Sequence, residues 1–274
     1  MSDSRKLIIN AAITGTVLNS TDTPHLPLSF EEIVESCRLV RGAGAAIVHL
    51  HARNSDQSPC YDPQVYTELV QRVRDATDLI VCVSLSGRFV SDLDVRAAAL
   101  AARPDMASLT AGSMNFMTQP SINSPDTIRG LAERIHASEA IPEIEVFEAG
   151  FINYANYLIR KGVLRPPHYF NLLFGSLGAA PLELIGLGHM VSMLPPGAVW
   201  SVGGMGQYQL DANVMAIAAG GHVRVGLEDN IYYDRDKTDL ADNVRLVARI
   251  VRIAREMGRE PATPDEARRI IGMP

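Results

Sequence analysis

The sequence predicts a single (β/α)8 barrel (TIM barrel), in which eight parallel strands alternate with helices. Short apolar runs alternate with longer segments of helical period about eight times, which is the pattern of a parallel barrel. The chain has 274 residues, and barrels of this kind usually need about 250 residues. No linker or change of composition divides the chain. We therefore expect one domain over residues 1–274, with the active site at the carboxyl ends of the strands.

The individual elements are expected where apolar runs and capping residues fall. Ser29 precedes an acidic helix start, and Ser124 precedes a proline and an aspartate, so both are expected to cap helices. The last long helix is expected over residues 239–258, with Gly258 at its end, and a short helix is expected from Pro264. The expected strands are residues 7–13, 45–51, 79–84, 105–109, 143–148, 168–174, 198–202 and 222–227.

The composition favours a globular protein that acts on a small molecule. With 47% hydrophobic and 20% charged residues, the chain can form a large core. A net charge of −6 argues against a nucleic acid or an anionic membrane as partner, because both need a basic face. No apolar run reaches the about 20 residues that span a bilayer. Cys37, Cys60 and Cys82 lack the spacing of a zinc or redox motif. We expect a cytoplasmic protein with reduced cysteines.

The strongest chemical signal is the segment from Val48 to Arg53. Strand alternation places His49, His51 and Arg53 on one face, and the apolar residues on the other. In a barrel the apolar face packs against helices, so the polar face must line the lumen. Two histidines two residues apart can then share one metal ion. The alternative is a pair of core histidines bonded to the backbone.

A second alternating segment, residues 221–230, is expected on the last strand and the loop after it. His222, Arg224 and Glu228 share a face there. Glu228 is the candidate for the third ligand, because two histidines and one carboxylate leave a position open for substrate. Its alternative role is a salt bridge to Arg224 or Arg53. The neighbouring Asp229 points elsewhere and is a candidate for a general base or a carboxylate behind the ligands.

Other strand ends carry polar residues that are candidates for substrate contact. Hydroxyls end the third and fourth strands, and two carboxylates lie near the fifth, where an inward position is costly unless a cation or substrate pairs with it. A glycine run follows the seventh strand, where barrels build phosphate sites from backbone amides. Each also has a structural reading as a cap or tight turn. These residues are Ser84, Ser86, Ser108, Thr110, Glu143, Glu145, Gly203 and Gly204.

Several segments together carry a family resemblance over essentially the whole chain. They are Ala12-Ile13-Thr14-Gly15, Pro24-His25-Leu26-Pro27, His49-Leu50-His51, Ala111-Gly112-Ser113-Met114-Asn115-Phe116, Pro142-Glu143-Ile144-Glu145-Val146, Gly220-Gly221-His222-Val223-Arg224 and Glu228-Asp229-Asn230. On these motifs the sequence resembles the β-keto acid cleavage enzyme family, whose first characterised activity is 3-keto-5-aminohexanoate cleavage.

The resemblance implies a zinc-dependent, retro-Claisen-type exchange. A β-keto acid and acetyl-CoA would give acetoacetate and a new acyl-CoA. The metal ligands would be His49, His51 and Glu228, and a homotetramer is implied as the common assembly. Another divalent metal is an alternative to zinc. The residues that the resemblance implies for the mechanism are Ser84, Ser108, Glu145, Arg224 and Asp229, with serine at 108 in place of threonine.

Substrate contacts are expected from Arg53, Val17 and Thr110, and from the glycine run that includes Gly203 and Gly204. Arg224 or Arg53 can grip a substrate carboxylate. Val17 departs from the family pattern, because the type that acts on an amino substrate has a glutamate there. An apolar group cannot pair with an ammonium, although Asp22 is a possible substitute. We expect a β-keto acid that is uncharged beyond its carboxylate.

Three alternatives to this enzyme follow from the same residues. A metal hydrolase of the amidohydrolase type also has paired histidines on a strand, but that family carries them on its first strand, with further histidines on the fifth and sixth. A metal-dependent aldolase would turn over without acetyl-CoA. A non-enzymatic metal-binding protein would favour four protein ligands, whereas three are expected here.

Overall fold

Eight parallel strands close into a barrel in the computed structural model, which describes residues 5–117 and 119–273. Around the barrel the strands follow the order β10-β11-β2-β3-β4-β5-β8-β9. Every predicted strand is present, so the predicted fold class is confirmed. The barrel strands are β2 (Ile9–Ala12), β3 (Ile47–Leu50), β4 (Ile80–Val83), β5 (Met106–Thr110), β8 (Ile141–Val146), β9 (Tyr169–Phe174), β10 (Val199–Gly204) and β11 (His222–Val225).

The first predicted strand, residues 7–13, is split in two. Only β2 belongs to the barrel, whereas β1 (Lys6–Leu7) pairs with β12 (Glu260–Pro261) in a separate two-stranded sheet. The break falls at Ile8, whose amide donates to Nδ1 of His222 at 3.0 Å and not to a strand carbonyl. A side-chain acceptor therefore separates the two pairings.

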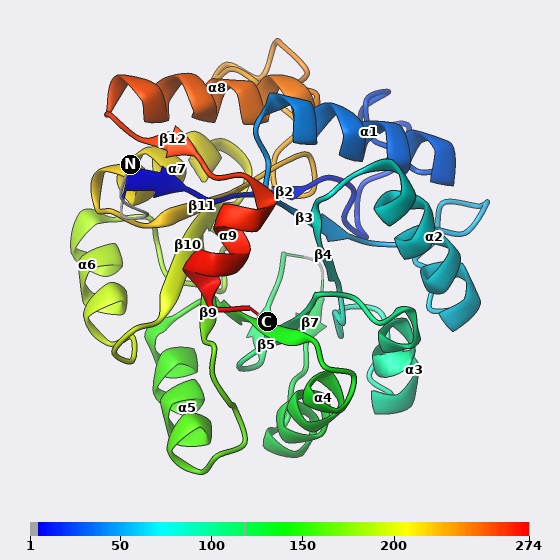
Figure 1. Cartoon of the computed structure of the whole chain (residues 1–274), viewed down its shortest axis with the longest axis vertical. Coiled ribbons are helices and arrows are strands. Elements are labelled where there is room, and N and C mark those ends of the chain that lie inside the picture. The colour runs from blue at the N-terminus through cyan, green and yellow to red at the C-terminus, as the bar shows by residue number, and fades with distance from the viewer. Residues whose placement is uncertain (1–4, 118, 274) are drawn as a thin grey trace.

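Helices surround the barrel on all sides (Figure 1). The predicted caps at Ser29 and Ser124 are confirmed, because each hydroxyl accepts a hydrogen bond from a backbone amide of its helix. The helices are α1 (Phe30–Ala43), α2 (Pro63–Ala76), α3 (Leu93–Ala97), α4 (Pro125–Ala137), α5 (Ala149–Arg160), α6 (Leu184–Ser192), α7 (Gln209–Ala218), α8 (Asn243–Glu256) and α9 (Pro264–Ile271), with 3-10 turns η2 (Ala98–Ala102) and η3 (Gly206–Tyr208). A small hairpin, β6 (Met114–Asn115) with β7 (Pro120–Ser121), follows β5.

The predicted start of the last long helix, residue 239, is wrong. Helix α8 begins at Asn243, after Asp242 caps it by accepting from the Arg245 amide. The residues before it form a loop that is closed by an isolated bridge between Tyr232 and Leu240. This bridge holds residue 240 extended, so the helix cannot begin earlier.

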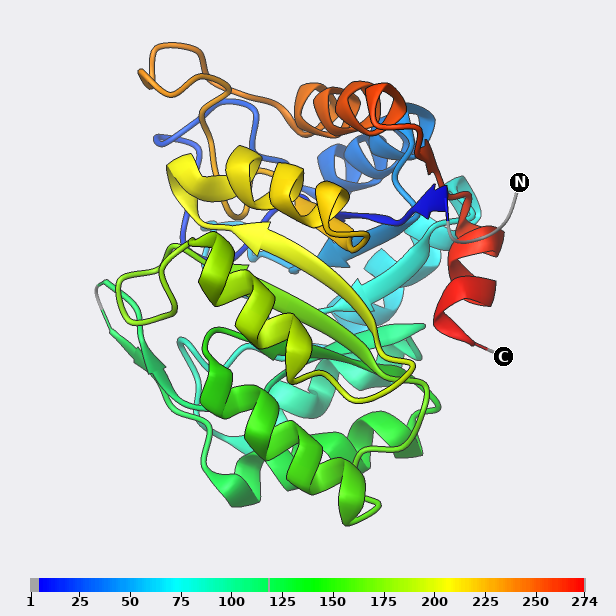
Figure 2. The ribbon, with the colours of Figure 1, turned by 90° about the vertical axis from the view of Figure 1, so that its left-hand side faces the viewer.

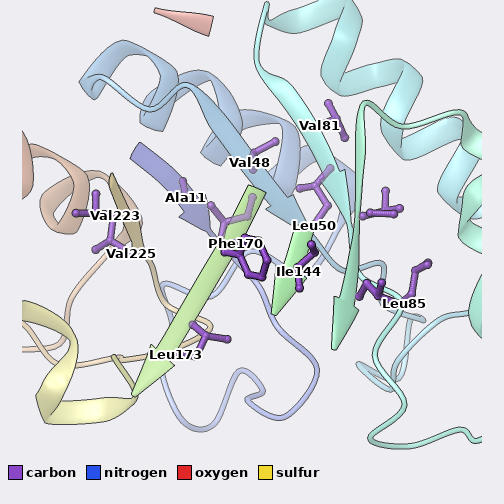
Figure 3. Packing of buried hydrophobic residues seen from close by; sticks show 14 of the residues in the cluster. Ala11, Val48, Leu50, Val81, Leu85, Ile144, Phe170, Leu173, Val223 and Val225 are labelled. Carbon is purple, nitrogen blue, oxygen red and sulfur yellow. The ribbon is translucent and has the colours of Figure 1, made fainter. Parts of the chain in front are cut away.

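The hydrophobic residues form two separate layers. The larger layer lies between strands and helices, and Figure 3 shows part of it, with Val48 and Leu50 of β3 and Ile144 of β8. The smaller layer fills the amino-terminal part of the lumen and includes Ile47 and Tyr169. Helix α9 packs against this smaller layer and covers that end of the barrel (Figures 1 and 2). Among the described residues, the polar lumen therefore opens toward the carboxyl ends of the strands.

Across the described residues, no helix combines the length and apolar character that crossing a membrane would require. All three cysteines are buried and free, as expected from their scattered spacing.

Candidate active site at the carboxyl ends of the strands

A cavity of about 570 Å³ opens where the strands end. Loops after the barrel strands line it, and the long loops lie at the end of the barrel opposite α9 (Figure 2). Charged side chains of both signs face the cavity. They are Arg88, Glu145, Arg224, Glu228, Asp229 and Lys237.

His51 and Glu228 line this cavity and come together with His49, which lies behind them, as the alternating segments predicted. The ligand atoms of all three lie within 4.8 Å of one another. His51 Nε2 is 3.3 Å from Glu228 Oε1, and His49 Nε2 is 3.9 Å from Glu228 Oε2. The geometry thus brings His49 of β3 and His51, the residue after β3, to a carboxylate that lies 177 residues beyond His51 in the chain.

These three side chains fit a divalent metal ion. Glu228 Oε2 is buried and has no hydrogen-bond partner among the described residues, which is costly for a carboxylate oxygen unless a cation faces it. Burial lowers the pKa of His51, so that the ring is neutral and can donate a lone pair. Burial alone would raise the pKa of Glu228, but Arg224 and both histidines hold it well below its usual range. Two imidazoles and one carboxylate are a frequent donor set for zinc.

Glu143 lies behind His49 and fixes its ring. His49 Nδ1 is 2.8 Å from Glu143 Oε2, while Asn10 and Asn171 donate to Glu143 Oε1 at 2.6 and 3.2 Å. The Cys82 thiol also lies 3.3 Å from Glu143 Oε2. Both oxygens of Glu143 are thus occupied. Although His49, Cys82 and Glu143 are also close enough to hold a metal, the group with Glu228 is the better candidate, because only that group has an unpartnered ligand atom.

Arg224 binds three carboxylates at once. Its Nε donates to Asp229 at 2.9 Å, a second nitrogen reaches Glu228 Oε1 at 2.8 Å, and Glu145 Oε1 lies 3.5 Å from the third. The sequence analysis expected Asp229 to point away from Glu228. Instead, Asp229 and Glu228 both accept hydrogen bonds from Arg224. Burial raises the pKa of Asp229 and of Glu145, against the opposing charge of Arg224. These raised pKa values suit groups that exchange protons.

Two glycines allow the loops after β2 and β11 to pack closely against each other. Gly15 has φ +70°, and a Cβ there would lie 2.8 Å from Glu228 Cγ. Gly226 has φ +156°, and a Cβ there would lie 2.0 Å from the Ala12 carbonyl oxygen. Asn243 then joins both loops, because its side chain accepts from the Leu227 amide and donates to the Ile13 carbonyl. Glu228 is held by this frame.

The other predicted site residues divide into two groups. Ser84, Thr110 and Val17 line the cavity, and Thr110 donates to Glu145 at 2.8 Å. Ser108 accepts from the Leu85 amide at 3.0 Å and is not among the lining residues.

Arg53, Gly203 and Gly204 are not among the lining residues either. The Arg53 guanidinium donates to the carbonyls of Gly15, Leu18 and Gln57, so that it anchors the loop after β2. The two glycines are packed against other residues: a Cβ on Gly203 would meet Leu173, and one on Gly204 would meet the Tyr208 carbonyl.

Arg88 is the most informative cavity residue that the sequence analysis missed. Ser84, Ser86 and Arg88 all line the cavity, so the alternation of β4 continues two residues beyond Ser86. That continuation was visible in the sequence. Lys237 was also missed, because it belongs to a loop with no periodic signal.

Comparison with known proteins identifies the family. The family model described as beta-keto acid cleavage enzyme matches residues 6–273. The chain is 37% identical over 273 residues to 3-keto-5-aminohexanoate cleavage enzyme of Fusobacterium nucleatum, covering 98% of both chains. It is 35% identical over 271 residues to 3-oxoadipate:acetyl-CoA acetyltransferase of Cupriavidus necator, covering 97% of this chain and 95% of that one.

A solved structure titled "Apo structure of ObcA" resembles the fold. It superposes with a TM-score of 0.80 at 22% identity and covers 91% of this chain but only 66% of its own. At this identity the likeness shows the barrel fold alone. Since the family match spans nearly the whole described chain, the protein belongs to the β-keto acid cleavage enzyme family, as its motifs predicted, and is an enzyme and not a metal-binding protein without catalytic activity.

Proposed function

We propose that this enzyme uses zinc on His49, His51 and Glu228 to exchange acyl groups between a β-keto acid and acetyl-CoA. In the overall reaction, a β-keto acid R–CO–CH2–COO⁻ and acetyl-CoA give acetoacetate and R–CO–S-CoA. The observation that carries the proposal is the buried, unpartnered Glu228 Oε2 beside two histidine nitrogens, at the bottom of a cavity lined by carboxylates of raised pKa. The cavity and its position at the strand ends are what a (β/α)8 enzyme over residues 1–274 requires.

The bound metal would act as a Lewis acid that polarises the ketone oxygen. Asp229 and Glu145 would then accept and donate the protons that the reaction moves. The carbon between the ketone and the carboxylate must lose a proton before it can form a new bond, and Asp229 is placed to accept it, because Arg224 holds it against Glu228. Arg224 keeps its third nitrogen without a hydrogen bond among the described residues, and this nitrogen is available for a substrate oxygen.

Hydroxyl groups complete the proposed site. Ser84 lines the cavity and is placed to donate to the substrate, while Ser108 holds the backbone that follows Ser84 by accepting from Leu85. Thr110 orients Glu145 through its 2.8 Å hydrogen bond. Arg53 would act on substrate only indirectly, by fixing the loop that carries Val17, since it donates to the Leu18 carbonyl. Gly203 would likewise act by leaving room for Arg224, whose Cβ lies 3.4 Å from the position of a Gly203 Cβ.

A homotetramer is the proposed assembly. Leu184 and Ile185 at the start of α6 are 77% and 79% exposed, and adjacent exposed apolar side chains favour a subunit contact. Sedimentation velocity of the purified protein tests this; a monomer at micromolar concentration would contradict it.

The experiment for the function combines metal analysis with a substrate screen. Purified protein should contain about one zinc per chain by this proposal, and it should turn over β-keto acids only when acetyl-CoA is present. Turnover without acetyl-CoA would indicate an aldolase instead. Hydrolysis of amides or esters with no use of β-keto acids would indicate the amidohydrolase type.

A further inference from the structure

Arg88 stands in the loop after β4 and lines the cavity together with Ser84 and Ser86. Its Nε atom is buried and has no hydrogen-bond partner in the part of the chain that the structure describes. Over residues 5–117 and 119–273, its guanidinium makes no ion pair with a carboxylate, unlike that of Arg224, which faces three. A partly buried cation without a partner is costly, because water no longer solvates it fully. The cavity therefore offers an unsatisfied guanidinium to a ligand.

The carboxylates of the cavity cannot supply the missing partner. Asp229 is bound by Arg224, and Glu145 is bound by Thr110 and Arg224. Glu228 is bound by Arg224 through Oε1, and its other oxygen faces the proposed metal. Burial lowers the pKa of Arg88, and the charges of these three carboxylates oppose that shift only from a distance. An anionic group of the ligand is thus the partner that this position fits.

The guanidinium of Arg88 is held in place before any ligand arrives. Its central carbon lies 3.5 Å from the centre of the Phe116 ring, and Phe116 packs edge-to-face on Phe147 at 5.7 Å. The backbone carbonyl of Arg88 accepts from the Gln119 side chain at 2.7 Å. A planar guanidinium stacked on an aromatic ring is preorganised to bind a carboxylate through two parallel hydrogen bonds.

We propose that Arg88 binds a second carboxylate of the substrate, so that the enzyme acts on a β-keto dicarboxylate of about six carbons. This inference rests on the proposed function. The first carboxylate is one methylene away from the ketone and so lies near Glu228, where one Arg224 nitrogen makes no hydrogen bond with the described residues. Arg88 belongs to a different loop and is stacked on an aromatic wall, which suits the far end of a short methylene chain. Lys237 is exposed, so it suits the phosphates of CoA better than the partly buried Arg88 does.

This inference revises the expectation drawn from Val17. Val17 lines the cavity and is 53% exposed, so it still supplies no partner for an ammonium group. The expectation of a substrate uncharged beyond its carboxylate overlooked the cation on another loop of the same cavity. An apolar Val17 together with Arg88 favours a second negative charge.

The test compares two substrates that differ only in the terminal carboxylate. With acetyl-CoA fixed, the enzyme should prefer 3-oxoadipate to 3-oxohexanoate by at least about tenfold in kcat/KM. Arg88→Met should lower kcat/KM for 3-oxoadipate by about 30-fold and for 3-oxohexanoate by less than about threefold. Arg88→Lys should retain part of the preference, because it keeps the charge but loses the planar pair of donors.

Arg38→Met is the matched control, since Arg38 is an exposed residue of α1 that pairs with Glu35 on the same helix. It should leave both substrates unchanged. An equal loss for both substrates in Arg88→Met would overturn the proposal, because it would place Arg88 on the first carboxylate. A raised KM for acetyl-CoA with unchanged substrate preference would overturn it in favour of a CoA phosphate site.

A binding measurement separates this inference from the proposed function. Calorimetry with adipate and hexanoate requires no turnover, so it reports on the anion subsite alone. Adipate should bind the wild-type protein about tenfold more tightly than hexanoate does, and Arg88→Met should remove the difference. Selective binding without any turnover would keep the subsite and refute the proposed reaction. Equal binding of both acids by the wild-type protein would refute the subsite. Unchanged circular dichroism and melting temperature exclude unfolding of Arg88→Met.

Discussion

His49 Nδ1 lies 2.8 Å from Glu143 Oε2, and both side chains are fully enclosed by the barrel. Burial by itself lowers the pKa of His49, but Glu228 and Glu143 raise it above its usual value. A proton on Nδ1 that is shared with Glu143 leaves Nε2 as the lone-pair donor on the side of Glu228. Glu143 therefore determines which nitrogen faces the proposed metal, although it does not reach the cavity itself.

Glu143→Gln should weaken metal binding without abolishing it. The amide keeps the shape of Glu143 but orients the imidazole less strongly, and partners behind metal ligands typically contribute about 10- to 100-fold in affinity. Competition with a chelator of known zinc affinity measures the change. Glu133→Gln on the exposed face of α4 is the matched control. Equal zinc affinity in both variants would show that Glu143 has only a structural role.

His51→Ala should remove the metal and the activity but leave the fold intact. His51 lies at the cavity and not in the hydrophobic layers, so the main loss is one ligand of three. Zinc content by mass spectrometry and the circular dichroism spectrum check the two parts of the prediction. His189→Ala, at an exposed position of α6, should keep its zinc. If His51→Ala kept about one zinc per chain and stayed active, the proposed ligand set would be refuted.

Asp229→Asn should keep the metal and lose rate by about 100- to 10,000-fold, which is the usual contribution of a general base. Burial raises the pKa of Asp229 despite the opposing Arg224. The base works only when ionised, so kcat/KM of the wild-type enzyme should fall as pH falls through this raised pKa. The pH profile of Asp229→Asn should lack that acid limb. If zinc is lost as well, Asp229 is itself a ligand.

His222 should make the protein sensitive to mild acid. Burial, with a smaller effect of Arg259, lowers the pKa of His222 from 6.5 to about 3, and its Nδ1 must stay unprotonated to accept from Ile8. The unfolded chain binds the proton first, so this stabilisation is complete above pH 6.5 and is lost as pH falls toward 3.

Between about pH 7 and pH 5 the loss from His222 is about 2 kcal/mol in the free energy of unfolding. His222→Gln should show a correspondingly smaller loss over the same interval, because glutamine does not titrate. Urea unfolding at the two pH values measures it, with wild type as the reference. An identical pH dependence in both proteins would contradict the assignment.

Val17→Glu should shift the substrate preference toward an ammonium-bearing substrate. Wild type should prefer a plain β-keto acid to 3-keto-5-aminohexanoate, since an ammonium against Val17 would lose solvation without gaining a partner. The variant should raise kcat/KM for the amino substrate by about tenfold or more, as expected for a charge-assisted hydrogen bond. Val17→Gln, which has the same length without charge, is the control. If kcat/KM of the wild-type enzyme were tenfold higher for the amino substrate, another carboxylate would have to bind the ammonium of that substrate. Asp22 would be the first residue to test.

The sequence by itself determined the barrel and most of the proposed metal site. Alternation of apolar and polar residues has a physical cause that acts locally, because each strand must turn one face to the helices and the other to the lumen. His49, His51 and Glu228 could therefore be placed on lumen faces before any fold was known. The carboxyl ends of parallel strands meet at one end, so these residues had to converge.

Only the tertiary structure decided which of the polar residues reach the cavity. Arg53 follows the histidines in the same alternation, yet backbone carbonyls of the loops after β2 and β3 accept from all three of its guanidinium nitrogens. Arg224 is shared among three carboxylates from two different strand ends, whereas Arg88 forms no ion pair with any carboxylate among residues 5–117 and 119–273. Which charges neutralise one another depends on distances between loops far apart in the chain. Local periodicity carries no information on those distances, so the sequence indicated the proposed metal ligands but not the guanidinium that we propose for the second carboxylate.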